Sequence, residues 1–466
     1  MIVMKFGGTS VGSAEAMRRV AHIVETYRSR KPVVVVSAMT KVTDTLRAIA
    51  REASEGRMPT QALEELHRRH EETITTLLSG KDKEQTLAVC LAMLDELEDI
   101  CRGISLLREL SLRSVDLVSS FGERLSAPIV AGLLNTIGMN AFSVDARQVV
   151  RTDDRHTEAE VDFPITDLLL CETILPAVAE DRIPVVTGFI GATEQGATTT
   201  LGRGASDYTA SIVGGALQAD EIWIWTDVDG AMTADPRIVE DAQVLEKITY
   251  HEAAEMSYFG AKVLHPKTMV PAVRRRIPIR IKNTFNPSSA GTLISDETTV
   301  MPLGAKTITS IDRLCLIMIE GSGLVGLPDT PARVFKTTAG LKATVLMITQ
   351  ASSEHDICLL LGEKDGLTVL HALRTEFARE LESGILEAVS MQPDIAVVAV
   401  VGQGMKGTPG MAARTFGILG KHQINIIAIA QGSSELNISF AVSRDDLQDT
   451  VRLVHQAFEL GKKKHS

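Results

Sequence analysis

The first 36 residues contain two short apolar runs separated by a helical pattern, and this order constrains the fold more than any other stretch. Ile2 to Met4 and Val33 to Val36 have the composition of strands that are buried on both faces. The segment between them is expected to form a helix that begins near Ser13, with apolar side chains on one face. A strand, a helix and a second strand in this order predict an α/β fold, with a parallel sheet and helices on both of its faces.

The connection after the first apolar run combines a lysine with two adjacent glycines. Lys5 stands at the expected exit of the strand, and Gly7-Gly-Thr-Ser10 follows before the helix. Paired glycines let the backbone approach a ligand closely and direct its N–H groups toward an anion. A lysine beside such a turn supplies the positive charge that a transferring phosphate requires. The same residues also fit an ordinary tight turn with an exposed lysine.

The composition is typical of a soluble globular protein, with 44% apolar and 23% charged residues. The length suffices for about three domains. A formal net charge of −11 argues against nucleic acid or an anionic membrane surface as the main partner. The cysteines lack paired spacing, which indicates reduced thiols, and we find neither a signal peptide nor a run of about eighteen apolar residues. We therefore expect a cytoplasmic protein.

The middle of the chain continues the alternation of helices and strands. Residues 61–107 have two amphipathic stripes that break near Gly80, which predicts a helical hairpin packed on the sheet. Further strands are expected at 141–144, 183–187, 221–225, 277–281 and 292–294.

Two polar segments of this region carry candidate functional side chains. Glu123 is expected near the start of a helix that follows Phe121. Arg203 lies between two glycines, and Ser206 is expected to cap a helix that runs to about Leu217. An arginine beside a helix N-terminus suits paired hydrogen bonds to a carboxylate. An arginine between two glycines is also typical of a surface turn.

An internal repeat occupies the C-terminal part of the chain. Gly321-Ser-Gly-Leu-Val-Gly326 aligns without gaps on Gly402-Gln-Gly-Met-Lys-Gly407, 81 residues later. Each copy has the order strand, glycine turn, helix, strand, strand, helix, which is the pattern of small ferredoxin-like modules. The pattern G-x-G-x-x-G also occurs in dinucleotide-binding domains, but neither copy has the acidic residue expected about twenty positions later.

The segment Lys5-Phe-Gly-Gly-Thr-Ser10 resembles the N-terminal signature of aspartate kinases, which belong to the amino-acid-kinase superfamily. The two C-terminal units resemble the tandem ACT domains that follow the kinase domain in that family. The resemblance implies a three-layer αβα catalytic domain with a mostly parallel sheet at 1–294, and ferredoxin-like ACT domains at 305–389 and 390–466. In that family the first ACT unit is inserted into the second in space, and we expect the same arrangement here.

The resemblance also assigns roles to residues at matching positions. It implies catalytic roles for Lys5, Asp207 and Lys262, in which Asp207 holds Lys5 toward the phosphates. The implied substrate-binding residues are Thr43, Glu123, Phe189, Arg203 and Ser206. The implied nucleotide-binding residues are Lys5, Gly7, Gly8, Thr226, Asp227, Met232, Arg237, Lys262 and Val263. Met232 departs from the family pattern, in which tyrosine is common, but methionine can still pack against a purine.

The resemblance implies that ATP, bound with Mg²⁺, donates its γ-phosphate to the side-chain carboxylate of L-aspartate. The product, 4-phospho-L-aspartate, serves lysine, threonine and methionine biosynthesis. A carboxylate with a reference pKa of about 3.9 is already ionised at neutral pH, so the transfer requires no general base. We expect the phosphates to hold the metal, without a metal site built from side chains. We also expect no homoserine dehydrogenase domain, since the chain stops directly after the second repeat.

The two repeats differ at positions that could bind a regulatory amino acid. The first has Asp356 where the second has Asn437, and Asp329 where the second has Gly410. We expect lysine and/or threonine as the effector, around Asp329, Gln350 and Asp356, and favour lysine modestly because only lysine offers two ammonium groups to these carboxylates. The same carboxylates also fit solvated turns. An isolated ferredoxin-like unit leaves a sheet edge to cover, so at least a homodimer joined through the repeats is expected.

Three alternative functions remain open. An acetylglutamate or glutamate kinase would share the fold, but it should not combine this N-terminal segment with the Arg203 loop and two C-terminal repeats. A non-catalytic amino-acid sensor would have lost residues that catalysis requires. The candidate residues are nevertheless all present: Lys5, Glu123, Arg203, Asp207 and Lys262. The third alternative, a nicotinamide dehydrogenase, is supported only by the two G-x-G-x-x-G segments.

Overall fold

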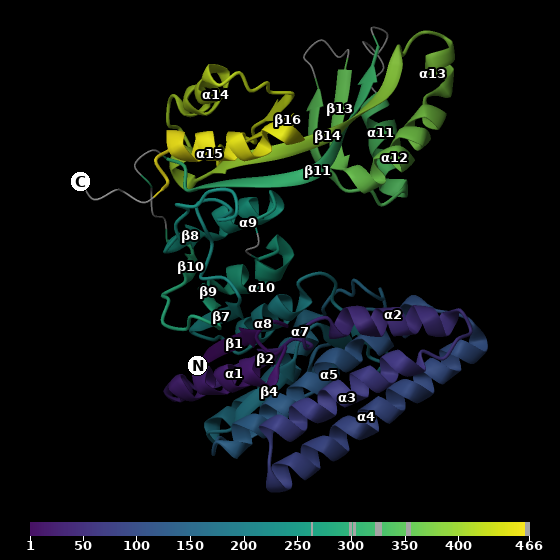
Figure 1. Ribbon diagram of the computed structural model, residues 1–466, viewed down its shortest axis with the longest axis vertical. Helices are drawn as coiled ribbons and strands as arrows, with labels where there is room; N and C mark the ends of the chain where they lie inside the picture. The colour runs from purple at the N-terminus through teal and green to yellow at the C-terminus, as the bar shows by residue number, and fades with distance from the viewer. Residues whose placement is uncertain (262–263, 298–300, 302–303, 322–328, 351–355, 462–466) are drawn as a thin grey trace. The chain divides into compact units, whose positions relative to one another are not determined.

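The computed structural model describes residues 1–261, 264–297, 301, 304–321, 329–350 and 356–461 (Figure 1). The chain divides into two compact units. Unit 1 comprises Met1–Ala231, Glu246–Tyr250 and Val263–Glu297, and unit 2 comprises Met232–Leu245, His251–Lys262 and Thr298–Ser466. Two segments that the sequence assigned to the catalytic domain therefore belong to unit 2. Their contacts explain this, since the Ile308 N–H donates to the Thr233 carbonyl and Lys306 pairs with Glu252.

Unit 1 is built on an eight-stranded sheet of order β3-β4-β2-β1-β7-β9-β10-β8. Every neighbouring pair is parallel except β9 and β10. The central strand β1 is buried along its whole length, as its apolar sequence predicts. The strands are β1 Ile2–Phe6, β2 Pro32–Val36, β3 Ala141–Val144, β4 Ile183–Thr187, β7 Glu221–Thr226, β8 Lys247–Thr249, β9 Ile279–Asn283 and β10 Thr292–Ser295.

Helices cover both faces of this sheet, which confirms the predicted three-layer arrangement (Figure 1). One layer contains α1 Ala14–Thr26, α2 Val42–Ser54 and α5 Leu112–Thr136, against which the hairpin of α3 Thr60–Leu77 and α4 Gly80–Leu107 packs. The other layer contains α7 Phe163–Ala179, α8 Ala205–Ala216 and α10 Pro266–Arg275. The short helix α6 Ala146–Val149 and the two-stranded ribbon of β5 Ile190–Ala192 and β6 Thr198–Thr200 lie between β3 and α8 in the chain.

Helix α5 is the core helix of unit 1. By length and composition alone it could cross a membrane, but 89% of its most apolar window is buried inside the protein. It begins at Leu112, where the Ser111 hydroxyl accepts a hydrogen bond from the Ser114 N–H. The expectation that Glu123 lies near a helix start was therefore wrong, because this upstream cap starts the helix eleven residues earlier.

The start of α8 also differs from the sequence-based expectation. Gly204, with φ +65°, occupies the cap position, and Ser206 already lies inside the first turn. The N–H groups of Asp207 and Tyr208 donate to the Gly204 carbonyl. The assignment of Ser206 as the cap was wrong because the chain enters the helix through a left-handed backbone conformation, which glycine adopts without strain.

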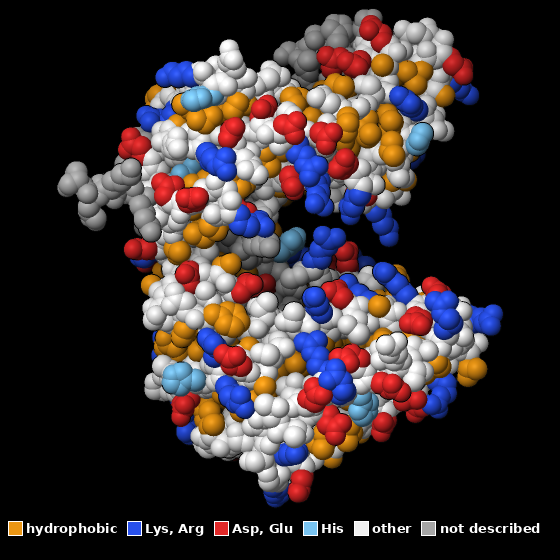
Figure 2. All heavy atoms as spheres, viewed as in Figure 1, with side chains coloured by type: hydrophobic (Ala, Val, Ile, Leu, Met, Phe, Trp, Pro, Cys, Tyr) orange, Lys and Arg blue, Asp and Glu red, His pale blue; other side chains and the backbone are white. Residues whose placement is uncertain are grey.

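Helices α3 and α4 expose charged side chains of both signs. Arg68 pairs with Glu65 and Glu72, and Arg102 pairs with Glu98. Figure 2 shows basic and acidic side chains interspersed over the region of these helices. This face therefore has mixed charge rather than the continuous basic surface typical of nucleic-acid binding.

Unit 2 contains a six-stranded antiparallel sheet of order β12-β13-β11-β14-β16-β15. The strands are β11 Thr307–Glu320, β12 Val345–Gln350, β13 Asp356–Gly362, β14 Ala388–Val401, β15 Ala428–Ala430 and β16 Asn437–Ser443. The helices of the two repeats are α11 Thr330–Gly340, α12 Glu363–Glu376, α13 Ala378–Glu382, α14 Met411–Lys421 and α15 Leu447–Ala457. These elements confirm two ferredoxin-like modules.

Two long strands pass through both modules. The segment 307–311 of β11 pairs with 397–401 of β14, and Ile308 shares a core with α14, α15 and β16. The segment 314–320 pairs with β13, and Ile317 shares a separate core with α11 and α12. The second module therefore begins with the first part of β11. The first module comes next in the chain, and the remaining elements of the second module follow it.

Candidate active site

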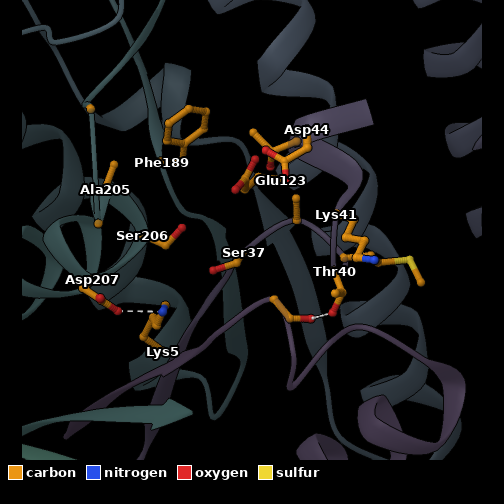
Figure 3. A pocket seen from close by; sticks show the side chains of 16 residues that line it. Lys5, Ser37, Thr40, Lys41, Asp44, Glu123, Phe189, Ala205, Ser206 and Asp207 are labelled. Atoms are coloured by element: carbon orange, nitrogen blue, oxygen red, sulfur yellow. Dashed lines mark hydrogen bonds and ion pairs between the residues drawn. The ribbon is translucent and has the colours of Figure 1, made fainter. Parts of the chain in front are cut away.

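A pocket of ≈ 330 Å³ opens in unit 1 where β1 and β2 end. The carboxyl ends of parallel strands are the usual ligand-binding edge of such sheets. The pocket is formed by the end of β1, the connection from β2 to α2 and the middle of α5. Phe189, which directly precedes β5, and the turn at the start of α8 complete it (Figure 3). The lining residues are Lys5, Gly8, Ser37, Ala38, Met39, Thr40, Lys41, Thr43, Asp44, Glu123, Phe189, Gly202, Gly204, Ala205, Ser206 and Asp207.

An ion pair lies on one side of this pocket. Lys5 Nζ is 2.6 Å from Asp207 Oδ1, and the lysine is only 8% exposed. The backbone of Lys5 is fixed between β2 and β7, opposite Val35 and Ile224, while Asp207 lies in the first turn of α8. A buried ammonium group with one carboxylate partner remains able to donate further hydrogen bonds, as phosphate binding requires.

The glycine turn after β1 lies close against the connection from β2 to α2. A Cβ atom on Gly8 would lie 3.1 Å from the Ala38 carbonyl oxygen, so a side chain would press on the backbone there. The Thr40 hydroxyl donates to the Gly8 carbonyl at 2.8 Å (Figure 3). Within the described part of the chain, the N–H groups of Gly8 and Thr9 donate no backbone hydrogen bond. Such N–H groups beside a lysine form a binding site for an anion.

Glu123 lies on the other side of the pocket, near Asp44 and Phe189 in Figure 3. The side chain is almost fully buried, and among the described residues its Oε2 atom has no hydrogen-bond partner. Burial raises the pKa of the Glu123 carboxyl to about 8, although the Ala38 backbone N–H and the Lys5 charge act in the opposite direction. A buried carboxyl that lines a pocket and has one oxygen without a hydrogen-bond partner suits a cationic ligand, because the cation would replace the lost hydration.

The structure brings most of the proposed aspartate-binding residues together. Thr43, Phe189 and Ser206 line the same pocket as Glu123. Phe189 has φ +71° and its N–H donates to the Thr209 hydroxyl, which fixes its backbone at the pocket wall. The Arg203 side chain is exposed and does not line the pocket, whereas both flanking glycines do.

The proposed nucleotide-binding residues divide between the two units. Thr226 is the last residue of β7 and Asp227 follows it, and the Gly7 N–H donates to the Trp225 carbonyl at 3.1 Å, so the glycine turn adjoins the end of β7. Met232 and Arg237 belong to unit 2, where Arg237 pairs with Asp235. Lys262 and Val263 lie outside the described residues.

The proposed effector-binding residues lie in the first repeat of unit 2. Gln350 ends β12 and Asp356 begins β13, and these two strands pair directly, with Gln350 opposite Ile357. The two side chains therefore belong to the same end of the sheet. Asp329 is exposed and precedes α11 at its cap position.

Sequence reasoning missed part of the pocket. Of the residues after β2 that line the pocket, only Thr43 was expected from the sequence to bind a ligand. Asp44 contributes a second carboxylate beside Glu123. Its place in the first turn of α2 is an ordinary helix-start position, so no local signal distinguishes it.

Comparisons with known proteins agree with this architecture. The amino acid kinase family matches residues 1–283, and an ACT domain model matches 317–377 and 398–458. Aspartokinase 1, chloroplastic, of Arabidopsis thaliana is 36% identical over 98% of this chain and 80% of its own length. The chain belongs to the aspartokinases of the amino acid kinase family. The chloroplastic bifunctional aspartokinase/homoserine dehydrogenase 2 of the same plant is 38% identical, and this chain spans about half its length, 51%.

Solved structures of the family share the whole fold. Aspartokinase III of E. coli in complex with aspartate and ADP matches with a TM-score of 0.81 and 31% identity, over 98% of this chain and 99% of that one. The same protein in complex with lysine and aspartate matches with the same TM-score and 32% identity, with the same coverage.

Proposed function

We propose that this chain is an aspartate kinase that transfers the γ-phosphoryl group of ATP to the side-chain carboxylate of L-aspartate, giving 4-phospho-L-aspartate and ADP. The observation that carries this proposal is the pocket that holds the Lys5–Asp207 pair on one side and the buried Glu123 carboxyl on the other. Membership of the aspartokinase family supports it, as does the likeness to an E. coli enzyme solved with aspartate and ADP.

Phosphoryl transfer requires the two reacting groups to be held in line, with positive charge near the phosphate oxygens. A side-chain carboxylate oxygen of aspartate forms a bond to the γ-phosphorus, and the bond from that phosphorus to the bridging oxygen breaks, so that ADP leaves. Lys5 is the group that stabilises the developing negative charge, and Asp207 keeps its ammonium directed into the pocket. The acceptor is already ionised, so none of these residues has to act as a base.

The pocket can orient aspartate through Glu123 and Asp44 and through the turn before α8. The ammonium group fits beside Glu123, which lines the pocket and whose Oε2 atom has no hydrogen-bond partner among the described residues, and Asp44 adds a second negative charge there. The α-carboxylate fits the turn 202–204, where Arg203 can make paired hydrogen bonds once its exposed side chain turns toward the ligand. Phe189, Thr43 and Ser206 supply the remaining wall.

ATP fits the edge formed by the glycine turn and the end of β7. The N–H groups of Gly8 and Thr9 and the Lys5 ammonium suit the phosphates, and Thr226, Asp227, Met232, Arg237, Lys262 and Val263 are proposed to complete the nucleotide site. Among the described residues no three His, Cys, Asp or Glu side chains gather as a metal site would require. We propose that the phosphates mainly hold Mg²⁺, which neutralises their charge.

We also propose regulation by a pathway amino acid at the first ACT unit, around Asp329, Gln350 and Asp356. The likeness to an E. coli aspartokinase III solved with lysine supports lysine as the effector. A homodimer joined through the ACT units, a cytoplasmic location and a role in lysine, threonine and methionine biosynthesis complete the proposal. The cysteines at described positions are all free, as expected of a reducing compartment.

An acceptor panel tests the activity. ADP release is measured with ATP and Mg²⁺ in the presence of L-aspartate, L-glutamate or N-acetylglutamate. We expect release with aspartate, at a rate well above that with either glutamate compound, and Arg203→Lys should raise the aspartate concentration required, because an ammonium cannot make the paired contact. Preference for N-acetylglutamate or glutamate would assign the chain a sibling activity, and no acceptor-dependent release would favour a non-catalytic sensor.

A further inference from the structure

Helix α5 carries a second buried carboxylate besides Glu123. Asp116 lies seven residues earlier, so the two are about two helical turns apart, on the same face of the helix. Asp116 is completely buried, with 0% exposure, yet it does not line the pocket. A buried carboxylate is costly unless several donors satisfy it, so its partners indicate what it holds in place.

The donors to Asp116 come from two segments far away in the chain. The Thr200 hydroxyl donates to Oδ1 at 2.6 Å. The Thr157 N–H donates to both carboxylate oxygens, at 3.1 and 2.9 Å, and His156 Nδ1 lies 2.8 Å from Oδ2. Thr157 has φ +76°, a conformation that is unfavourable for a β-branched residue. Asp116 therefore fastens the end of β6 and a strained loop to the core helix.

These two segments support the turn that precedes α8. The Ala159 N–H donates to the Thr200 carbonyl at 3.0 Å, which joins them to each other. The Leu201 N–H donates to the Phe189 carbonyl at 3.0 Å, which joins the end of β6 to the pocket wall. A Cβ atom on Gly202 would lie 3.6 Å from the Glu158 Cγ atom, so the loop lies directly against this turn. The chain from Thr200 to Gly204 is thus supported from one side by groups that Asp116 holds.

We infer that Asp116 is a positioning residue for the turn 201–204, which sets the path from which Arg203 reaches the α-carboxylate of the amino-acid substrate. The inference rests on the proposed aspartate kinase activity. Asp116 does not touch the substrate. It acts through the Thr200 hydroxyl and the Thr157 N–H on the backbone of Gly202 and Arg203, so its loss should weaken substrate binding more than it slows the chemical step.

The test compares steady-state kinetics of full-length variants. Asp116→Ala removes the contacts to Thr200, Thr157 and His156, and Thr200→Val removes only the hydroxyl while keeping the side-chain shape. We expect Asp116→Ala to raise the KM for aspartate at least about tenfold, equivalent to about 1.4 kcal/mol. Thr200→Val should shift it in the same direction by less, and the KM for ATP should change less than about twofold in both. Asp116→Asn keeps one acceptor oxygen, which can still accept from both the Thr157 N–H and the Thr200 hydroxyl, and should restore most of the affinity.

Two comparisons separate positioning from general loss of stability. Asn135, on the same helix, accepts from the Ala141 N–H and donates to its carbonyl, away from the turn. Asn135→Ala should lower the melting temperature without changing the KM for aspartate. In an Arg203→Ala background, Asp116→Ala should add less than about twofold to that KM, because the group it positions is already absent.

The outcomes distinguish this inference from the proposed function. An inactive wild type contradicts the activity itself. If the wild type is active, three results would contradict the inference alone. Folded Asp116→Ala and Thr200→Val could keep the wild-type KM for aspartate, or Asn135→Ala could raise that KM as much as Asp116→Ala does. The third is an Asp116→Ala effect on the KM that persists in full in the Arg203→Ala background. If Asp116→Ala does not fold, Thr200→Val against Thr200→Ser decides, because serine retains the hydroxyl.

Discussion

Lys5 Nζ lies 2.6 Å from Asp207 Oδ1, so that one ion pair joins the end of the central strand to the first turn of α8. The two residues are far apart in the chain, and β1 and α8 bring them together at the sheet edge where the pocket opens. Because both partners are held by regular elements, the ammonium keeps its direction before any substrate binds. Preorganised charge of this kind is the main source of rate enhancement in phosphoryl transfer.

Removal of the lysine should therefore affect the chemical step. We expect Lys5→Ala to lower kcat by about 10²- to 10³-fold, the cost typical of removing one group that stabilises transition-state charge. The melting temperature should change little, and Lys247→Ala, which removes an exposed ion pair with Glu297, should leave kcat unchanged. A variant that loses only aspartate affinity and keeps its turnover would contradict the role of Lys5.

Asp207 should act through Lys5. We expect Asp207→Asn to lower kcat by less than Lys5→Ala does, because the ammonium loses its direction but not its charge. The double variant should be no slower than Lys5→Ala alone, since the two residues form one unit. Additive losses in kcat would show that Asp207 has an independent function.

The raised pKa of Glu123, about 8, predicts a pH dependence of substrate binding. Below this value the free protein has a neutral Glu123, and an ammonium ligand binds better to the ionised form. The KM for aspartate should therefore fall as the pH rises from about 6.5 to 8.5, by up to tenfold per unit in the steepest part. Glu123→Gln should have a flat and higher KM. A wild-type KM that is flat over this range would show that Glu123 does not meet the ammonium group.

The same carboxyl also predicts the sign of a stability change. Its pKa is raised in the folded protein from an ordinary value of 4.5 to about 8, so between these values the folded state keeps a proton that the unfolded chain has released. The free energy of unfolding should fall as the pH rises through this window, and Glu123→Gln should weaken that dependence. Urea unfolding at pH 5 and pH 8 measures the difference between the two proteins.

Two glycines with opposite surroundings give a matched pair of stability predictions. A Cβ atom on Gly12 would lie 2.3 Å from the Thr40 hydroxyl oxygen, which bonds to Gly8, whereas a Cβ atom on Gly103 in α4 would meet nothing within 4 Å. Gly12→Ala should destabilise by about 1–3 kcal/mol and raise the KM for ATP. Gly103→Ala should stabilise by about 0.5–1 kcal/mol through helix propensity, without kinetic effect. Thermal melts with kinetics on both variants check this, and a neutral Gly12→Ala would show that the glycine turn tolerates displacement.

Regulation is tested by inhibition of the forward reaction with lysine, threonine and both together. We expect inhibition by lysine that is weakened at least about tenfold in Asp356→Asn, since a carboxylate partner of an ammonium group is lost. Asp445→Asn, in the second repeat, is the control and should keep wild-type inhibition. Strong inhibition that is unchanged in Asp356→Asn would remove this residue from the effector site, and no inhibition by either amino acid would leave the repeats without a regulatory role.

The sequence predicts the elements whose signals are local. Helix α1 begins next to Ser13 as expected, and the Ser13 hydroxyl caps it by accepting from the Ala16 N–H; the apolar runs of β1 and β2 form adjacent parallel strands. The internal repeat predicts both ferredoxin-like modules because each copy carries its own strand and helix patterns. The start of α5 was missed because the cap at Ser111 lies far upstream of the polar segment around Glu123.

The contacts that shape the site could be predicted only in part. The Lys5–Asp207 pair was expected from the family resemblance, not from any local pattern. The Asp116 contacts join residues 41 and 84 positions apart, and neither hydrophobic periodicity nor turn chemistry reports on such distant hydrogen bonds. The exposed side chain of Arg203 agrees with the surface turn that the sequence left open as an alternative to ligand binding. The sequence did not decide between the two, because a turn between two glycines fixes the backbone but not the direction of a long side chain.

The most direct test of the central claim identifies the bond that is made. The protein is incubated with ATP, Mg²⁺ and L-aspartate in the presence of hydroxylamine, which converts an acyl phosphate into a hydroxamate, and both the hydroxamate and ADP are quantified. We predict the side-chain hydroxamate of aspartate in a one-to-one ratio with ADP, with both lost in Lys5→Ala. ADP without hydroxamate, or hydroxamate on the α-carboxylate, would contradict the assignment of this pocket to phosphorylation of the aspartate side chain.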